Sequence, residues 1–233
     1  MRLDKFVCKS SELTRLEAIQ KINDGEVNVN GDLETNEAIQ VHENNTVTLN
    51  GKTLKARAFR YILLHKPVGT ICSNVDEVYP SVLNYLKVDN PSELHIVGRL
   101  DADTTGLVLM TDDGNWSFNI TRPINKCRKV YRVGLSKVIA GNVASKFKNG
   151  LKLQGEPSLT LPAELEIINP KEVLLTLTEG KFHQVKRMFA AIGNRVVSLH
   201  REKIGKVQLD VDLGQWRYLT DAEVHSFKKI SHV

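Results

Sequence analysis

The sequence has few cysteines and no pattern typical of a structural metal site. Its 233 residues include three widely spaced cysteines, Cys8, Cys72 and Cys127, and no Cys-x-x-Cys pair. An odd number of isolated thiols is typical of reduced cysteines in a cytosolic protein rather than of a disulfide framework. The seven histidines do not cluster. We therefore expect no metal site, no disulfide and a cytoplasmic location.

Long hydrophobic runs and export signals are also missing. Apolar runs such as residues 61–64 and 107–110 have the length of a strand, far short of the ~20 residues of a membrane helix. The first residues, Met-Arg-Leu-Asp-Lys-Phe, contain neither an apolar core nor a cleavage site. Aromatic residues are 6% of the chain, but 41% hydrophobic and 25% charged residues are typical of a globular protein. Because the apolar runs are short and the basic stretches lack a sustained amphipathic helix, we expect no membrane partner. No glycine-rich nucleotide-binding loop is present, so we expect no cofactor.

Acidic residues are absent from two long basic stretches. Residues 115–155 contain nine Lys or Arg and no Asp or Glu, and residues 181–201 contain five more basic residues without an acid. Together with a net charge of +5 and a pI near 9.0, this segregation indicates a polyanionic partner such as RNA. The alternative is an incidental solvated basic face. The side chains that we expect to contact phosphates are Arg122, Lys126, Arg128, Lys137, Lys146 and Lys148.

The first 55 residues have the pattern of a small α-α-β module. Apolar residues at helical spacing predict one helix near residues 3–7, and a possible capping box, Thr14 with Glu17, begins a second helix that Gly25 can end. The residues expected to face inward from this second helix are Leu13, Leu16, Ile19 and Ile22. Short strands at 27–29 and 46–49 precede Asn-Gly turns at residues 30–31 and 50–51.

This module resembles the S-four-type RNA-binding domain that occurs in a ribosomal protein and in several RNA-modifying enzymes. The resemblance rests on the Arg-Leu-Asp-Lys-Phe start, on Thr-Arg at 14–15 and on Gly-x-Val-x-Val-Asn-Gly at 25–31. It implies RNA contacts by Arg2, Lys5 and Arg15. A generic helical cap is the alternative. Residues 52–60 read as a basic linker to a second domain, so the expected domains are residues 1–55 and 56–233.

The second domain reads as α+β, with a mixed and largely antiparallel sheet and flanking helices. Strands are predicted at residues 61–65, 95–97, 106–111, 130–135, 164–168, 173–178, 196–199 and 207–211. Helices are predicted at residues 81–85, 115–120, 138–149, 182–192 and 221–230. An Asn-Pro turn at 169–170 joins two strands as an antiparallel pair. Hairpins of this kind favour α+β over a regularly alternating βαβ order.

One polar loop between two predicted strands has the residues that catalysis needs. Residues 98–107 read Gly-Arg-Leu-Asp-Ala-Asp-Thr-Thr-Gly-Leu, with the carboxylates Asp101 and Asp103 held between hydrophobic strands. Strands on both sides would hold such a loop rigidly while its tip faces a cleft. Taken alone, an Asp in a turn is more often structural, because its side chain accepts local backbone hydrogen bonds.

The same loop, with three other motifs, resembles the RNA pseudouridine synthases of the small-subunit ribosomal family. The other motifs are Tyr-Ile-Leu-Leu-His-Lys-Pro-x-Gly at 61–69, Lys-Val-Tyr at 129–131 and Glu-Gly-Lys-Phe-His-Gln-Val-Lys-Arg-Met at 179–188. The resemblance implies that Asp101 is the catalytic nucleophile, that Tyr131 packs beside the target base and that Lys186 pairs with the nucleophile. The other residues that it implies in substrate or RNA binding are Arg99, Thr105, Lys129, His183, Gln184, Val185 and Arg187.

Without the resemblance, Lys186 could be an ordinary surface lysine and Tyr131 an ordinary sheet aromatic. A helix over residues 182–192 would turn Phe182, Val185, Phe189 and Ile192 inward and leave Lys186 at its edge. A cation beside a carboxylate and an aromatic face for a flipped base both suit the chemistry of uridine isomerisation.

The expected function is therefore conversion of one uridine to pseudouridine in 16S ribosomal RNA, at uridine 516. The expected partner is 16S rRNA or a small-subunit assembly intermediate, and the expected state is a monomer. One alternative is the related activity on a 23S rRNA uridine. A second is a non-catalytic RNA-binding or ribosome-assembly protein, which would have no use for Asp101 opposite Lys186.

Overall fold

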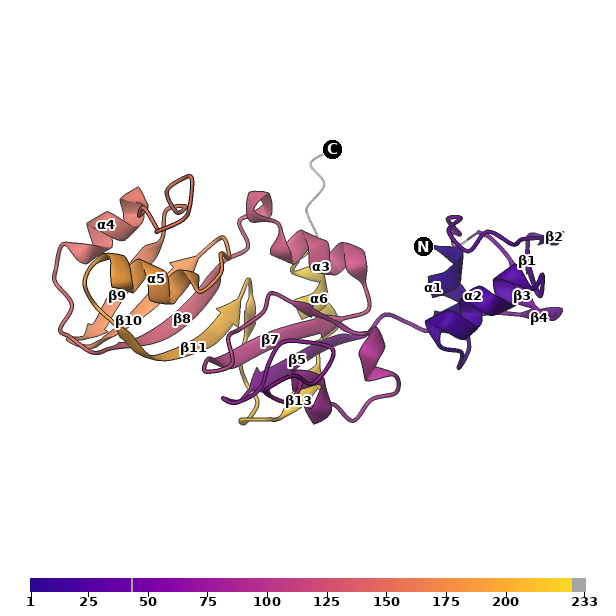
Figure 1. The fold of residues 1–233 in the computed structure, drawn as a ribbon, viewed down its shortest axis with the longest axis horizontal. Helices are drawn as coiled ribbons and strands as arrows, with labels where there is room; N and C mark the ends of the chain where they lie inside the picture. Colours follow the sequence, from indigo (N-terminus) through magenta and orange to yellow (C-terminus); the bar gives the residue numbers. More distant parts are fainter. Residues whose placement is uncertain (43, 228–233) are drawn as a thin grey trace. The chain divides into compact units, whose positions relative to one another are not determined.

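The computed structural model describes residues 1–42 and 44–227, which form two compact units, Met1–Ala58 and Phe59–Val233 (Figure 1). Among these described residues, no helix is both long enough and apolar enough to cross a bilayer.

The first unit packs two helices on a small antiparallel sheet. Its helices are α1 (Leu3–Ser10) and α2 (Arg15–Asn23), and its strands are β1 (Val27–Val29), β2 (Asp32–Leu33), β3 (Val47–Leu49) and β4 (Lys52–Thr53), in the order β2-β1-β3-β4. Both Asn-Gly turns have positive φ at both residues, as a two-residue hairpin requires. Strand β4 lies where we expected the start of the linker.

The second helix begins as predicted, but one of the residues expected to face inward is exposed. The capping box between Thr14 and Glu17 is present. Leu16, however, is 79% exposed, whereas Ala18 and Ile22 are fully buried. The prediction that Leu16 faces inward is wrong, because α1 and the sheet cover only the narrow stripe of α2 that contains Ala18 and Ile22.

A buried carboxylate ties the two helices of this unit together. Asp4 is fully buried, and both Arg2 and Arg15 donate hydrogen bonds to it, with Arg15 Nη2 at 2.8 Å from Oδ2. Burial alone would raise the pKa of the Asp4 carboxyl, but the two guanidinium groups outweigh burial and hold that pKa below its ordinary value. Two of the three expected RNA contacts in this unit therefore also stabilise its fold.

The second unit is built on one mixed sheet (Figure 1). Along the sheet the strands are β13 (Trp216–Tyr218), β5 (Tyr61–Lys66), β7 (Thr105–Thr111), β11 (Val196–Ile204), β8 (Lys129–Leu135), β10 (Glu172–Leu177) and β9 (Glu164–Asn169). Strand β6 (His95–Val97) pairs with β7, and β12 (Val207–Gln208) pairs with β11. Among the strand pairs of the described residues, only β7 and β11 are parallel. The predicted antiparallel turn at residues 169–170 joins β9 to β10.

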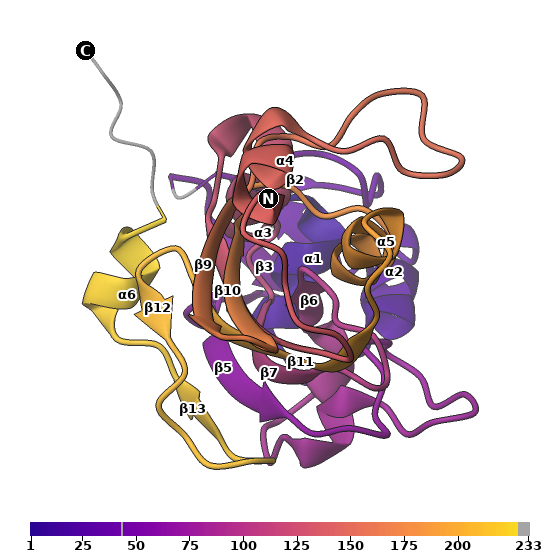
Figure 2. The same ribbon diagram turned by 90° about the vertical axis from the view of Figure 1, so that its left-hand side faces the viewer.

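Helices cover both faces of this sheet, with α5 and α6 on opposite sides (Figure 2). The α-helices are α3 (Gly114–Thr121), α4 (Val143–Asn149), α5 (Gln184–Ala191) and α6 (Asp221–His225), and the 3-10 helices are Val82–Tyr85, Pro91–Glu93 and Pro123–Asn125. Along β5, Ile62 and Leu64 belong to the buried cluster that also includes residues of α4 and α5, whereas Leu63 belongs to the cluster that includes residues of α3 and α6. Burial on both faces explains why β5 and β7 are apolar without alternation.

Several predicted boundaries differ from the observed ones for local reasons. The helix predicted from residue 138 begins at Val143, because the Ile139 amide is bonded to the Pro170 carbonyl and Gly141 follows. The helix predicted from Phe182 begins at Gln184, because His183 has left-handed backbone angles. Strand β11 continues five residues beyond its predicted end at Leu199, and β12 is shorter than predicted. The last part of the helix predicted at residues 221–230 lies outside the described residues.

Gly106 allows the parallel contact between β7 and β11. Its φ is +116°, and a Cβ placed there would lie 2.3 Å from the carbonyl oxygen of Arg201. Only glycine has both the required backbone angle and the required space. The close approach of the two strands at this point therefore depends on the absence of a side chain.

We expect Gly106→Ala to destabilise the protein by at least ~2 kcal/mol, because the clash is with backbone that cannot move aside. Gly114→Ala is the matched control, since nothing lies within 4 Å of a Cβ at the first residue of α3. Urea unfolding followed by circular dichroism measures both variants. Equal stability of the two would contradict the close-packing account.

Candidate active site

Two buried cations, Lys66 and Arg201, hold the backbone of the segment between β6 and β7. Lys66 is fully buried, and its Nζ donates to the carbonyl oxygens of Thr104 at 2.9 Å and Pro67 at 3.0 Å. Arg201 is 1% exposed and donates to the carbonyl oxygens of Leu107 at 2.7 Å and Gly98 at 2.8 Å. Both ends of the segment are therefore bonded to side chains from neighbouring strands.

Main-chain bonds complete the support of this loop. The Gly69 amide donates to the Ala102 carbonyl at 2.9 Å, and the Thr104 amide donates to the Asp101 carbonyl at 3.1 Å. The Leu100 amide donates to Cys72 Sγ at 3.3 Å. Burial lowers the pKa of the Lys66 ammonium, while the nearby carboxylates of Asp101 and Asp103 favour its charged form. The result is a loop whose backbone is fixed and whose two carboxylates point outward.

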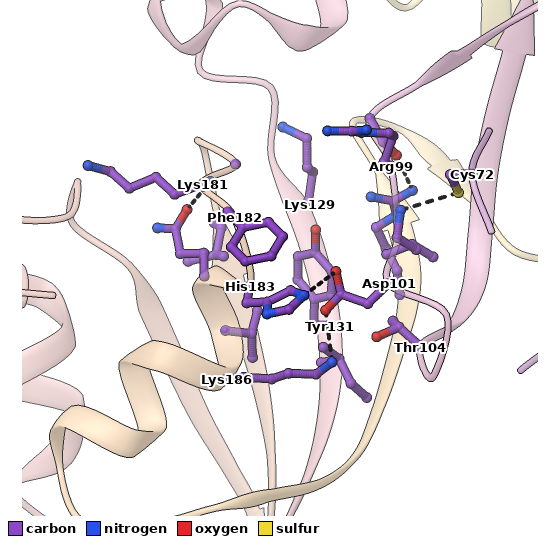
Figure 3. Close-up of a pocket in the computed structure, with 18 of the residues that line it drawn as sticks. Cys72, Arg99, Asp101, Thr104, Lys129, Tyr131, Lys181, Phe182, His183 and Lys186 are labelled. Carbon is purple, nitrogen blue, oxygen red and sulfur yellow. Dashed lines mark hydrogen bonds and ion pairs between the residues drawn. The ribbon is translucent and has the colours of Figure 1, made fainter. Parts of the chain in front are cut away.

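The two carboxylates share one lysine from α5. Lys186 Nζ lies 2.8 Å from Asp101 Oδ2 and 2.6 Å from Asp103 Oδ1 (Figure 3 labels Lys186 and Asp101). His183 Nε2 lies 3.6 Å from the other oxygen of Asp101. The side chain of Asp101 is 28% exposed and that of Asp103 is 72% exposed. Asp101 is thus the more enclosed of the two.

These contacts shift two pKa values in opposite directions. Burial alone would lower the pKa of Lys186, but its hydrogen bonds to Asp101 and Asp103 outweigh burial and raise that pKa above its ordinary value. The hydrogen bond from Lys186 lowers the pKa of Asp103. Lys186, Asp101 and Asp103 therefore form one ion-paired cluster.

The approach to α5 is rigid because a buried acid and amide hold it. Gln184 Nε2 donates to Glu179 Oε1 at 2.7 Å, and the Lys181 amide donates to Gln184 Oε1 at 2.8 Å. The Leu161 amide donates to the same Glu179 oxygen at 2.8 Å. Glu179 and Gln184 are both buried. This bonding fixes the turn that presents His183 and Lys186 to Asp101.

A cleft of about 630 Å³ opens beside this cluster. Asp101, Tyr131 and Lys186 all line it, so the three predicted catalytic residues come together from the loop after β6, from β8 and from α5 (Figure 3). The Tyr131 ring is 8% exposed, with the Arg201 guanidinium carbon 5.9 Å from its centroid. Across the described residues, no group of three or more His, Cys, Asp or Glu side chains is arranged to hold a metal ion.

Five other predicted binding residues also line this cleft: Arg99, Lys129, His183, Gln184 and Val185. Arg99 is exposed, whereas Lys129 is 6% exposed and donates to the Cys127 carbonyl at 3.2 Å. Burial lowers the pKa of Lys129. Gln184 and Val185 are at most 5% exposed, so their surroundings are those of residues that support the wall of the cleft.

Other predicted RNA contacts lie elsewhere and have protein partners. Thr105 Oγ1 lies 2.7 Å from His200 Nδ1 and is not among the cleft residues. Arg187 donates to Glu156 Oε1 at 3.0 Å and to the Phe182 carbonyl at 3.0 Å. Arg128 is paired with Glu164. These cations are partly neutralised within the protein.

Three of the residues that build this site are not among those predicted from the sequence. Lys66 belongs to the motif at residues 61–69, and a lysine that closes an apolar strand is unusual. Arg201 follows Leu199 at the two-residue period of an inward strand face, which was a usable signal. Glu179 shows no local signal, because its partners Gln184 and Leu161 meet it only in the folded chain.

The chain is similar to known proteins over most of its length. A sequence profile described as RNA pseudouridylate synthase matches residues 60–191. The "Ribosomal small subunit pseudouridine synthase A" of Vibrio cholerae is 49% identical to this chain, covering 98% of this chain and all of that protein. The protein of the same name from Escherichia coli K12 is 46% identical, covering 97% and 99%. A solved structure entitled "Crystal structure of pseudouridylate synthase" superposes with a TM-score of 0.72 at 41% identity, covering 98% of this chain and 100% of that one.

The ion-paired cluster predicts a pH-dependent contribution to stability. Because the folded pKa of Asp103 is lowered, its contribution is present above about pH 3.8 and is lost as the pH falls through the folded value. Because the folded pKa of Lys186 is raised, its contribution is present below about pH 10.5 and is lost as the pH rises beyond it. We expect Lys186→Ala to be less stable than the wild type at pH 7 by on the order of 1 kcal/mol, and by less near pH 3.

Urea unfolding at both pH values measures this difference. Lys146→Ala, on the exposed face of α4, is the control and should differ little from wild type at either pH. A stability loss at Lys186→Ala that is the same at pH 3 and pH 7 would exclude the ion pairs as its source.

Proposed function

Because this chain belongs to the RNA pseudouridylate synthase family, and so is an RNA pseudouridine synthase, we propose that it converts one uridine of 16S ribosomal RNA to pseudouridine. The observation that carries the proposal is Asp101, held beside Lys186 in a cleft that also contains Tyr131. The proposed target is uridine 516, in 16S rRNA or in a small-subunit assembly intermediate. The names of the relatives favour a uridine in the RNA of the small ribosomal subunit over a uridine in 23S rRNA.

The reaction is an isomerisation that conserves all atoms. The bond between ribose C1′ and uracil N1 breaks, the uracil turns, and C5 forms the new bond to C1′, while C5 loses a proton and N1 gains one. A duplex or stacked strand hides these atoms, so the nucleotide must be extruded into a pocket before it reacts. We assign the cleft beside Asp101 to the extruded uridine.

Each of the three grouped residues has a proposed role. Asp101 is the nucleophile, because its carboxylate lies in the cleft and is still 28% exposed to a substrate, whereas the cleft carboxylate of Glu179 is buried and bonded to Gln184. Lys186 fixes the direction of that carboxylate through its 2.8 Å hydrogen bond. Tyr131 offers an aromatic face for the uracil, as flipped bases commonly require. Arg99, exposed at the cleft, is proposed to bind the RNA there.

The first unit is proposed to be an S-four-type RNA-binding domain. Its Lys5 is exposed, and Arg2 and Arg15 remain 37% and 57% exposed while they bind Asp4. Phosphate contacts of this kind add affinity without reading a base sequence. Selection of the site would then depend on both units together.

We predict that Asp101→Asn abolishes pseudouridine formation, with turnover lowered at least ~1000-fold, while RNA affinity changes less than threefold. The amide keeps the shape of the side chain but cannot act as a nucleophile. Asp103→Asn is the matched control, since it also removes one negative charge beside Lys186, but from a side chain that is 72% exposed. Single-turnover assays on a 16S rRNA transcript measure both variants, and mapping of pseudouridines in rRNA from cells without the protein identifies the target. Normal turnover by Asp101→Asn would refute the assignment of the nucleophile.

Removal of residues 1–58 should weaken RNA binding about tenfold or more and leave the second unit folded, because each unit has its own core. Filter binding to the same transcript and thermal unfolding of residues 59–233 test the two halves of this expectation. Undiminished rRNA binding by the shortened chain would contradict an RNA-binding role for the first unit.

A further inference from the structure

Phe182 is an exposed aromatic side chain in the cleft wall. It lines the cleft with Asp101 and Lys186, yet 75% of its surface is exposed. The predicted helix would have turned Phe182 into the core, and that prediction is wrong. His183 has left-handed backbone angles, φ of 48° and ψ of 34°, so the helix begins only at Gln184. Phe182 therefore lies before the helix and is not part of its apolar face.

The backbone around Phe182 is held in place from three sides. Its carbonyl accepts a hydrogen bond from Arg187 Nη1 at 3.0 Å. Lys181 Nζ and Arg187 Nη1 both reach the carboxylate of Glu156, at 2.9 and 3.0 Å. Gln184 holds the Lys181 amide. The exposure of Phe182 is therefore imposed by a bonded framework rather than left to a loose loop.

One face of the Phe182 ring is already covered by a stacked partner. The rings of Phe182 and His183 lie 3.7 Å apart between centroids at an interplanar angle of 22° (Figure 3). His183 in turn lies between Phe182 and Asp101, with Nε2 3.6 Å from the carboxylate. The other face of Phe182 can receive a planar group, one ring further from Asp101 than His183.

We propose that this face of Phe182 stacks on the nucleobase next in sequence to the extruded uridine. The inference rests on the proposed function. The target uracil has its own aromatic face in Tyr131 and must reach Asp101, whereas Phe182 is separated from Asp101 by the His183 ring. When the uridine is extruded, the neighbouring base loses a stacking partner. That neighbour can regain stacking on an aromatic side chain.

An exposed cation in the cleft favours a nucleic-acid occupant over an apolar one. Arg99 lines the same cleft and is exposed, so a phosphate next to the stacked base would meet its positive charge. Lys181 and Lys186, by contrast, are already paired with carboxylates. Phe182 is thus a substrate-binding residue that fixes the position of the strand while the uridine is held at Asp101.

The test is a binding cycle in the full-length Asp101→Asn protein, so that no product forms. The probes are a 16S rRNA fragment containing the mapped uridine and three versions with an abasic site: at the 5′ neighbour, at the 3′ neighbour, or at the uridine itself. Phe182→Ala should bind the intact fragment about tenfold more weakly, and Phe182→Tyr should bind it within about twofold of Phe182. The loss at Phe182→Ala should disappear with one neighbouring abasic site and persist with the abasic uridine.

Phe118→Ala is the matched control, because Phe118 is also an exposed phenylalanine but does not line the cleft. Its ring partner is Arg122, whose guanidinium carbon lies 4.6 Å from the ring centroid. The effect of Phe118→Ala should be the same with all four RNAs. The proposal is overturned if Phe182→Ala binds the intact fragment normally, if its loss is equal with both neighbouring abasic sites, or if the loss disappears only with the abasic uridine. Failure of the proposed function is distinct, since wild-type protein would then form no pseudouridine in 16S rRNA.

Discussion

The site depends on a loop whose backbone carbonyls are bonded to two buried cations. A buried ammonium or guanidinium group costs several kcal/mol unless it is well paired. Lys66 and Arg201 are paired with backbone carbonyl oxygens, and these hydrogen bonds hold Thr104, Leu107 and Gly98 in place. The carboxylates of Asp101 and Asp103 offset the positive charge of Lys66. The two buried cations thus fix the backbone of the loop, and Lys186 fixes the direction of the Asp101 carboxylate.

The parallel contact of β7 with β11 brings the parts of the site together. It places Arg201 against Gly106 and, through the antiparallel pairing of β11 with β8, puts Tyr131 opposite Arg201. The chain then reaches α5 from β10, the strand on the other side of β8. Residues 101, 131 and 186 meet because the sheet order differs from the sequence order. A side chain at Gly106 would disturb this whole arrangement at its centre.

The protein uses many of its basic residues internally. Arg2 and Arg15 hold Asp4, Arg132 is paired with Glu172 and Glu202, and Arg187 is paired with Glu156. The pairs of Arg132 and Arg187 are partly exposed and add little to stability, but they orient long side chains and reduce the positive charge that these residues present to solvent. The number of basic residues thus overstates the number available to phosphates. The bonded network around Glu156 has a second effect, because it holds Phe182 outward.

The sequence by itself determined the local features of this protein. The capping box at Thr14, the Asn-Gly turns and apolar strands such as β5 follow from short-range chemistry, and each is predicted near its observed place. Motif resemblance led to Asp101, Tyr131 and Lys186, which the fold brings to one cleft. Only the tertiary structure decided the functions of Lys66, Arg201 and Glu179, because their partners are distant in sequence. It also decided the exposure of Leu16 and Phe182. Hydrophobic spacing shows which face of a helix is apolar, but it does not show how much of that face a neighbour covers. Nor does it show where a left-handed residue such as His183 sets the start of the helix.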